Sequence, residues 1–129
     1  MTRVVPFLLV AFFIVGMTIS CAPPEEKMVR HLSRVAQILE ENQDRPDEAG
    51  DKLIGYLRDN IDEIKRVAEE LDAKDKKVSG AEKNKYHERW NHEIRPIMEK
   101  IQRLMKNEKL STNPKVIEAF KDLGEIIAR

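Results

Sequence analysis

The chain has 129 residues with 23 basic and 23 acidic side chains, so its formal net charge is zero. This balance argues against a dedicated nucleic-acid-binding protein, which usually carries a clear basic excess. Only five glycines and few aromatic residues occur, while the helix-favouring residues Glu, Lys, Leu, Ile and Ala are abundant. We therefore predict an all-α protein.

An almost uninterrupted apolar run, Val4 to Ile19, follows a basic start at Arg3. As a helix this run would span about 24 Å, which is short of the roughly 30 Å hydrocarbon core of a bilayer. An uncleaved transmembrane helix is thus the weaker of two interpretations. A secretory signal has a basic start, an apolar centre and small residues before the cleavage site, and it fits the segment better.

The only cysteine, Cys21, ends the sequence Thr18-Ile19-Ser20-Cys21 directly after the apolar run. This tetrapeptide resembles the lipobox of bacterial lipoprotein precursors, although Thr18 stands where that family most often has leucine. The resemblance implies that residues 1–20 are a signal peptide and that Cys21 carries acyl chains as the first mature residue. Acylation would also account for a lone thiol in an exported chain. The alternative is an inert, buried cysteine near an ordinary cleavage site.

The same resemblance implies a location in the cell envelope. Acyl chains on Cys21 would anchor the protein stably in a membrane, because each buried CH₂ group contributes about 0.8 kcal/mol. An aspartate directly after the cysteine retains such proteins in the inner membrane, but Ala22 occupies that position here. The periplasmic face of the outer membrane is therefore the expected location.

Removal of residues 1–20 would leave one helical domain, residues 21–129, with a net charge of −1. Apolar spacing and turn-forming prolines and glycines predict four helices, at about 24–42, 47–74, 80–107 and 114–128. Short connections favour an up-down antiparallel bundle. Residues 44–75 carry a net charge of −5 and residues 76–115 one of +6, which favours pairing of the second and third helices. We therefore predict a long central hairpin, with Gly55 allowing close approach of the first helix.

The predicted central hairpin is longer than the first and last helices, so its far end would lack outer helices. The apolar residues expected there are a candidate partner-binding surface, comprising Val67, Leu71, Tyr86 and Trp90. Uncovered apolar patches commonly mark contact sites, and Trp and Tyr are enriched in interface hot spots. The predicted partner is an envelope protein or the membrane itself. The alternative is that the two paired helices bury these side chains unaided.

A second functional hypothesis is a pocket for a small apolar ligand in the third helix. Pro96 removes one backbone hydrogen bond there, and should kink the helix without breaking it. The expected lining is Tyr86, Trp90 and Met98. Quenching of the single tryptophan by a ligand would distinguish this hypothesis from a protein-interaction module.

Catalytic and metal-binding chemistry are not predicted. The chain has no glycine-rich phosphate loop, CxxC or HExxH motif. His87 and His92 lie about 140° apart around one helix, and His31 lies on another, so we expect solvated surface histidines. No activated nucleophile or paired acid and base is evident. We therefore expect a lipid-anchored helical module that is not an enzyme and needs no cofactor.

Overall fold

The computed structural model describes residues 22–128, so the lipobox and Cys21 lie outside the described residues. Within this range all regular secondary structure is helical, which confirms the predicted all-α class. The helices are α2 (Pro24–Glu41), α3 (Pro46–Lys77), α4 (Ala81–Leu104), α5 (Glu108–Ser111) and α6 (Pro114–Ile127).

Proline marks the start of three of these helices. Pro24, Pro46 and Pro114 lie in the first turns of α2, α3 and α6, where a missing N–H removes no helical hydrogen bond. Pro96 lies inside α4, which continues through it unbroken. The short α5 was not predicted. It begins after Asn107, whose side chain accepts a hydrogen bond from the backbone N–H of Lys109, and this cap explains where α5 begins.

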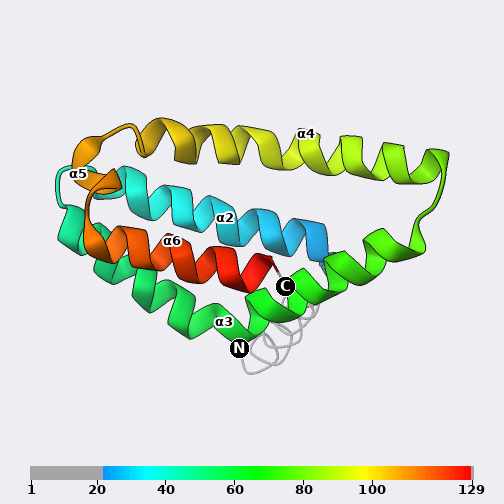
Figure 1. Ribbon diagram of the computed structural model, residues 1–129, viewed down its shortest axis with the longest axis horizontal. Coiled ribbons are helices and arrows are strands. Elements are labelled where there is room, and N and C mark those ends of the chain that lie inside the picture. Colours follow the sequence, from blue (N-terminus) through cyan, green and yellow to red (C-terminus); the bar gives the residue numbers. More distant parts are fainter. Residues whose placement is uncertain (1–21, 129) are drawn as a thin grey trace, which may run out of the picture.

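The helices pack in an order that differs from their order along the chain. α3 packs against both α2 and α6, whereas α4 packs against α2. Figure 1 shows α2 and α4 running in one direction and α3 and α6 in the other, so α2 lies parallel to α4 and α3 lies parallel to α6. Only the packed pair α2 and α3 is antiparallel.

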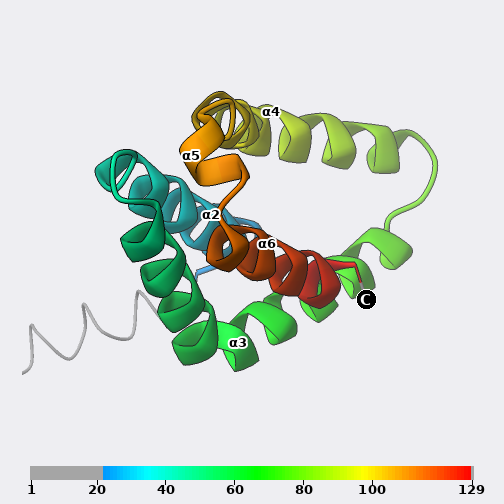
Figure 2. The same cartoon turned by 60° about the vertical axis from the view of Figure 1, so that its left-hand side comes forward.

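The prediction that α3 and α4 pack together as a central hairpin is therefore wrong. α3 and α4 are joined by the turn at residues 78–80, but they diverge after it and make at most marginal contact (Figure 2). Gly80 in this turn has a φ of 63°, a conformation that side chains other than glycine rarely adopt. The turn reverses the chain without bringing the two helices side by side.

α6 approaches α3 closely at Gly50. A Cβ atom at Gly50 would collide with the Cβ of Lys115 and lie 3.1 Å from the backbone nitrogen of Val116. Ala49 and Ala119 are also fully buried in this region. Gly55, which was expected to admit a neighbouring helix, has no such contact, because nothing lies within 4 Å of the position of its Cβ. The prediction for Gly55 was wrong. Gly50 is the glycine that allows close approach, and the helix that approaches it is α6.

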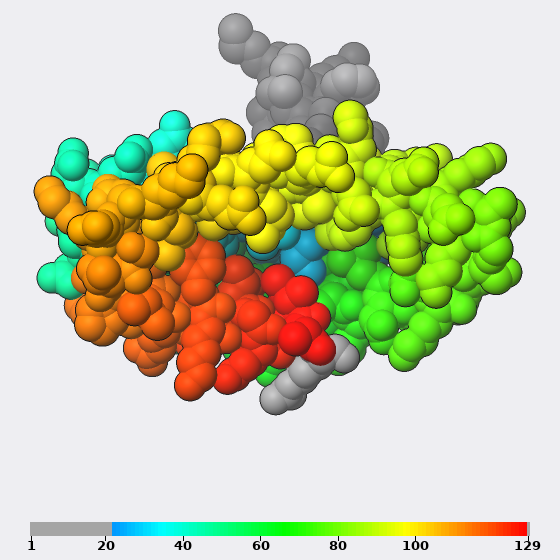
Figure 3. Space-filling model, turned by 45° about the horizontal axis from the view of Figure 1, so that its top comes forward, coloured from blue at the N-terminus to red at the C-terminus, as the bar shows by residue number. Residues whose placement is uncertain are grey.

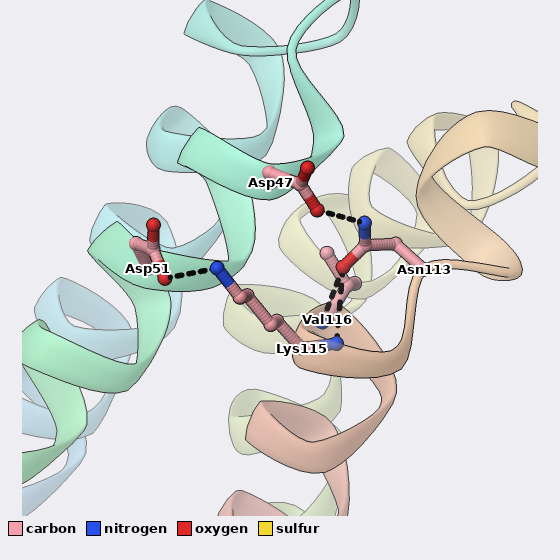
Figure 4. Close-up of polar contacts among 5 residues, drawn as sticks. All are labelled: Asp47, Asp51, Asn113, Lys115 and Val116. Carbon is pink, nitrogen blue, oxygen red and sulfur yellow. Dashed lines mark hydrogen bonds and ion pairs between the residues drawn. The ribbon is translucent and has the colours of Figure 1, made fainter.

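Polar contacts fix the start of α6 on α3 (Figure 4). The side-chain oxygen of Asn113 accepts hydrogen bonds from the backbone N–H groups of Lys115 and Val116, at 3.0 and 3.2 Å. The amide nitrogen of Asn113 donates to Asp47 on α3 at 2.9 Å. Lys115 forms an ion pair with Asp51 at 2.9 Å. One buried asparagine thus caps α6 and joins it to α3.

The hydrophobic core lies among α2, α3 and α6. α4 adds only one buried side chain, Ile101, and α5 adds Leu110. The other core side chains are Met28, Leu32, Val35, Ala36, Ile38 and Leu39 from α2, Ala49, Leu53, Leu57, Ile64 and Val67 from α3, and Val116, Ala119, Leu123 and Ile126 from α6. The other side chains on the inner face of α4 are therefore only partly buried.

Candidate functional site

An open apolar groove lies between α4 and α6, with α2 and the C-terminal part of α3 beneath it. Figure 3 shows this hollow between the two helices, with residues of α2 and α3 visible at its floor. Its cavity volume is about 670 Å³. It is lined by Met28 and Leu32 of α2, Ala68, Leu71, Asp72 and Asp75 of α3, Tyr86, His87, Trp90, Ile94, Met98 and Ile101 of α4, and Phe120, Leu123, Gly124, Ile127 and Ala128 at or beside α6.

The groove exists because α4 and α6 both face the core yet barely touch each other. Met98 and Ile127 at its two sides remain 40% and 41% exposed, although they are large apolar side chains. Gly124 lines the groove, and nothing lies within 4 Å of the position that its Cβ would occupy. Its missing side chain leaves that part of the groove open.

Charged side chains line only one end of the groove. Asp72 and Asp75 come from the last turns of α3, and His87 comes from the second turn of α4. Asp75 and His87 form a hydrogen bond across the turn. The hydrogen bond from His87 holds the pKa of Asp75 below its usual value, with Lys83 adding to this effect. Asp75 is therefore ionised at neutral pH.

A second polar cluster joins α2, α3 and α4 behind the groove. The Oε1 atom of Glu25 is withdrawn from solvent and lies 2.5 Å from the Nζ atom of Lys74. The same Nζ atom lies 5.6 Å from the centre of the Tyr86 ring, within cation–π range. Burial, together with the neighbouring Glu25 carboxylate, raises the pKa of Tyr86 to about 12. The cluster ties the start of α2 to the diverging ends of α3 and α4.

Tyr86 and Trp90 separate the groove from a second, more polar cavity of about 590 Å³. Both side chains line both cavities. The second cavity is also lined by Pro23, at the start of the described chain, and by Glu25. The polar end of the groove and the N-terminal end of α2 therefore lie at the same end of the molecule.

Three of the four residues predicted to bind a partner lie in the groove, namely Leu71, Tyr86 and Trp90. Val67 does not, because it is 0% exposed in the core and cannot contact a partner. The expectation that this end has no outer helix was wrong in part. α2 reaches it through the contact of Glu25 with Lys74, but the last turns of α3 and the first turns of α4 extend beyond α2 and α6 (Figure 1). α3 bends near its middle, so a straight-helix estimate of coverage fails there (Figure 2).

All three residues predicted to line a pocket near Pro96 are found together. Tyr86, Trp90 and Met98 line the groove on the α4 side. The α6 side, with Phe120, Leu123 and Gly124, was not predicted as part of any site. The apolar spacing of α6 indicated a buried face, but it did not indicate that part of this face borders an open groove.

The histidines do not form a common site. His31 is only 8% exposed, so the expectation that it is solvated was wrong. Its Nδ1 atom lies 2.6 Å from the hydroxyl of Tyr56, and its Nε2 atom lies 3.5 Å from Glu63. Burial raises the pKa of Tyr56, so its hydroxyl keeps a proton to donate. Over residues 22–128 no three His, Cys, Asp or Glu side chains are grouped so that they could hold a metal ion.

No protein-family model matches the chain, and neither the curated proteins nor the solved structures include a match to it. Among the helices in residues 22–128, none combines the length and apolar character needed to cross a bilayer. The candidate site is therefore defined by geometry and chemistry alone.

Proposed function

We propose that the protein is a lipid-anchored binding protein of the bacterial cell envelope, and that its groove holds an apolar, chain-like ligand. The observation that supports this proposal is the groove itself. Ligand sites are typically concave, about 300 to 1,000 Å³ in volume, and lined by apolar and aromatic side chains with a few polar groups. The groove, at about 670 Å³ with Trp90, Tyr86 and one polar end, has these properties.

The position of the groove supports a ligand drawn from the membrane. Pro23 lies two residues after Cys21 and lines the cavity that shares Tyr86 and Trp90 with the groove. In the proposal, acyl chains on Cys21 hold this end of the molecule at the bilayer surface, at the periplasmic face of the outer membrane. A bilayer supplies apolar chains, and each CH₂ group moved from water into the groove would contribute about 0.8 kcal/mol.

The proposed anchor has a direct test. Growth of cells with a labelled fatty acid should give a labelled mature chain, and the Cys21→Ser variant should carry no label. Absence of label from the wild-type chain, or a mature chain that begins at another residue, would remove the anchor from the proposal.

A protein-interaction module is the second candidate function. Met98 and Ile127 are large apolar side chains that stay exposed at the sides of the groove. A partner protein in the envelope could insert apolar side chains between them, since buried aromatic and aliphatic anchors dominate interface energies. This candidate uses Leu71, Tyr86 and Trp90 but not the buried Val67.

The proposed groove ligand can be tested with the single tryptophan as the reporter. The full chain is placed in phosphatidylcholine nanodiscs, and an uncharged brominated alcohol with a dodecyl chain is added. Trp90 lines the groove, so bound bromine should quench its fluorescence in a saturable way. The Gly124→Phe variant fills the groove with a side chain and should lose the saturable part of the quenching.

Gly55→Phe is the matched control, because it places the same side chain on a helical glycine that also has nothing within 4 Å of its Cβ position. Gly55 lies outside the groove, so this variant should be quenched like the wild type. Equal quenching of all three proteins would show partition into the nanodisc and exclude the groove as a ligand site. A thermal unfolding curve for each variant confirms that it is folded.

A further inference from the structure

We infer that the ligand is a single-chain amphiphile with a cationic head, whose chain lies along α4 and whose head meets Asp72 and Asp75. This inference rests on the proposed function and names its ligand class. The lining of the groove is asymmetric, since its charged side chains lie at the end beside the 78–80 turn. An amphiphile has the same asymmetry.

The shape of the groove favours an extended chain. Its α4 wall runs from His87 to Ile101, which corresponds to about 21 Å along the helix axis. Over this distance the side chains that face the groove change from His87 to the apolar Ile94, Met98 and Ile101. An elongated apolar groove with a polar end accommodates an alkyl chain with one head group.

The charges that line the polar end are two carboxylates. α2 and α6 contribute no charged side chain to the lining, and α4 contributes only His87. His87 is paired with Asp75, and the side chain of His87 is 47% exposed. A cation placed at this end would therefore meet Asp72 and Asp75 and no lysine or arginine of the lining.

The nearby lysines do not block such a cation. Lys76 pairs with Asp72 at 3.0 Å, but its side chain is 75% exposed. Exposed ion pairs of this kind contribute little, so a ligand ammonium can replace Lys76 at small cost. Lys74 is directed to Glu25 on the other side of Tyr86. Lys83 lies close enough to Asp75 to lower its pKa, but it does not line the groove.

The test compares head groups on a constant chain. Bromododecyltrimethylammonium, bromododecanoate and the uncharged brominated alcohol are titrated into the full chain in phosphatidylcholine nanodiscs, with Trp90 fluorescence as the readout. The cationic probe should bind about tenfold more tightly than the anionic probe, as expected for contact with one or two partly solvated carboxylates. The uncharged probe should lie between them.

Substitution of carboxylates shows which side chains cause the preference for the cationic probe. In the double variant Asp72→Asn and Asp75→Asn the preference for the cationic probe should fall to about twofold or less, while binding of the uncharged probe stays unchanged. Asp62→Asn removes an exposed α3 carboxylate outside the groove and should leave the preference intact. Both sets of variants keep the apolar lining.

Three outcomes are decisive. A preference for the cationic probe that the double variant abolishes and Asp62→Asn retains supports the inference. Equal binding of all probes, or tighter binding of the anionic probe, overturns the inference but leaves the proposed apolar site standing. Saturable quenching by none of the three probes overturns both the inference and the proposed function.

Discussion

Two helical glycines in this protein lie in opposite packing environments, one tightly packed and one open. Gly50 lies where a Cβ would meet the Cβ of Lys115 and the backbone of Val116, so α6 can approach α3 only because the side chain is absent. Gly124 meets nothing within 4 Å and therefore has no packing reason to lack a side chain. Glycine in a helix interior costs about 0.5 to 1 kcal/mol relative to alanine. At Gly124 the glycine destabilises the helix by this amount, and its missing side chain leaves the groove open.

Alanine substitutions at Gly50 and Gly124 should change the free energy of unfolding in opposite directions. Gly50→Ala should lower the free energy of unfolding by about 1 to 3 kcal/mol, because a closely packed helix pair must move apart. Gly124→Ala should raise it by about 0.5 to 1 kcal/mol, because the unfolded chain loses freedom and no contact is strained. Urea unfolding of the full chain in nanodiscs, followed by circular dichroism, measures both.

Gly55→Ala is the control for this pair, since it also has nothing within 4 Å of the new Cβ. It should raise stability like Gly124→Ala. A loss of stability in Gly124→Ala, or none in Gly50→Ala, would contradict the packing described for α6.

At the scale of the helices, Asn113 links the cap of α6 with the surface of α3. Its oxygen accepts from two backbone N–H groups, and its nitrogen donates to Asp47 at 2.9 Å. Asn113→Ala should therefore cost about 1 to 2 kcal/mol of unfolding free energy, through loss of the cap and of a buried hydrogen bond. Urea unfolding gives the value.

The Asn113→Asp variant separates the two roles. It keeps the capping oxygen but places a carboxylate next to Asp47, so the α3 contact is lost while the cap remains. If the cap alone matters, Asn113→Asp will be as stable as the wild type. If the contact with α3 also matters, as the structure indicates, Asn113→Asp will be less stable, and the additional Asp47→Asn change will restore part of the loss.

Four of the five helices in residues 22–128 could be predicted from the sequence, but the short α5 and the packing partners of the helices could not. Apolar spacing and prolines indicate where a helix lies and which face is apolar, and these signals are local. The packing of α6 on α3 includes close approach at Gly50, which brings together residues far apart in the sequence. Charge balance indicated the wrong pairing, because ion pairs on exposed surfaces contribute little.

The candidate site could be predicted only in part, because the sequence signals are local. Tyr86, Trp90 and Met98 lie on one face of one helix, so their spacing brought them together in the prediction. Phe120 and Gly124 join them only because α6 lies beside α3 and leaves a gap next to α4. A groove between two helices that do not pack together has no signature in the spacing of either helix.

For the whole molecule, the contact of Glu25 with Lys74 makes stability depend on pH. Burial by itself would raise the pKa of Glu25. The hydrogen bond from Lys74, a backbone hydrogen bond and the positive charge of Lys74 together outweigh this effect, so the pKa lies below 4.5. A carboxylate with a lowered folded-state pKa stabilises the fold at pH values above 4.5. This contribution is lost as the pH falls from 4.5 through the lowered pKa.

The Glu25→Gln variant should therefore have a lower melting temperature than the wild type at pH 7, and the difference should shrink at about pH 3. Glu26→Gln is the matched control, because Glu26 is exposed and its ion pair within residues 22–128 is with the exposed Arg30 on the same helix. It should change the melting temperature little at either pH. A constant difference between wild type and Glu25→Gln across this range would contradict the linkage.

The parallel pairing of α3 with α6 also determines when the core can form during synthesis. The hydrogen bond between Asp47 and Asn113 joins positions 66 residues apart, and of the helices in residues 22–128 α6 is made last. Until then α3, the longest of these helices, lacks the cover of α6 on one apolar face, and contacts this distant in sequence form slowly. Any version of the polypeptide shortened before residue 114 would keep that face bare and should aggregate rather than fold.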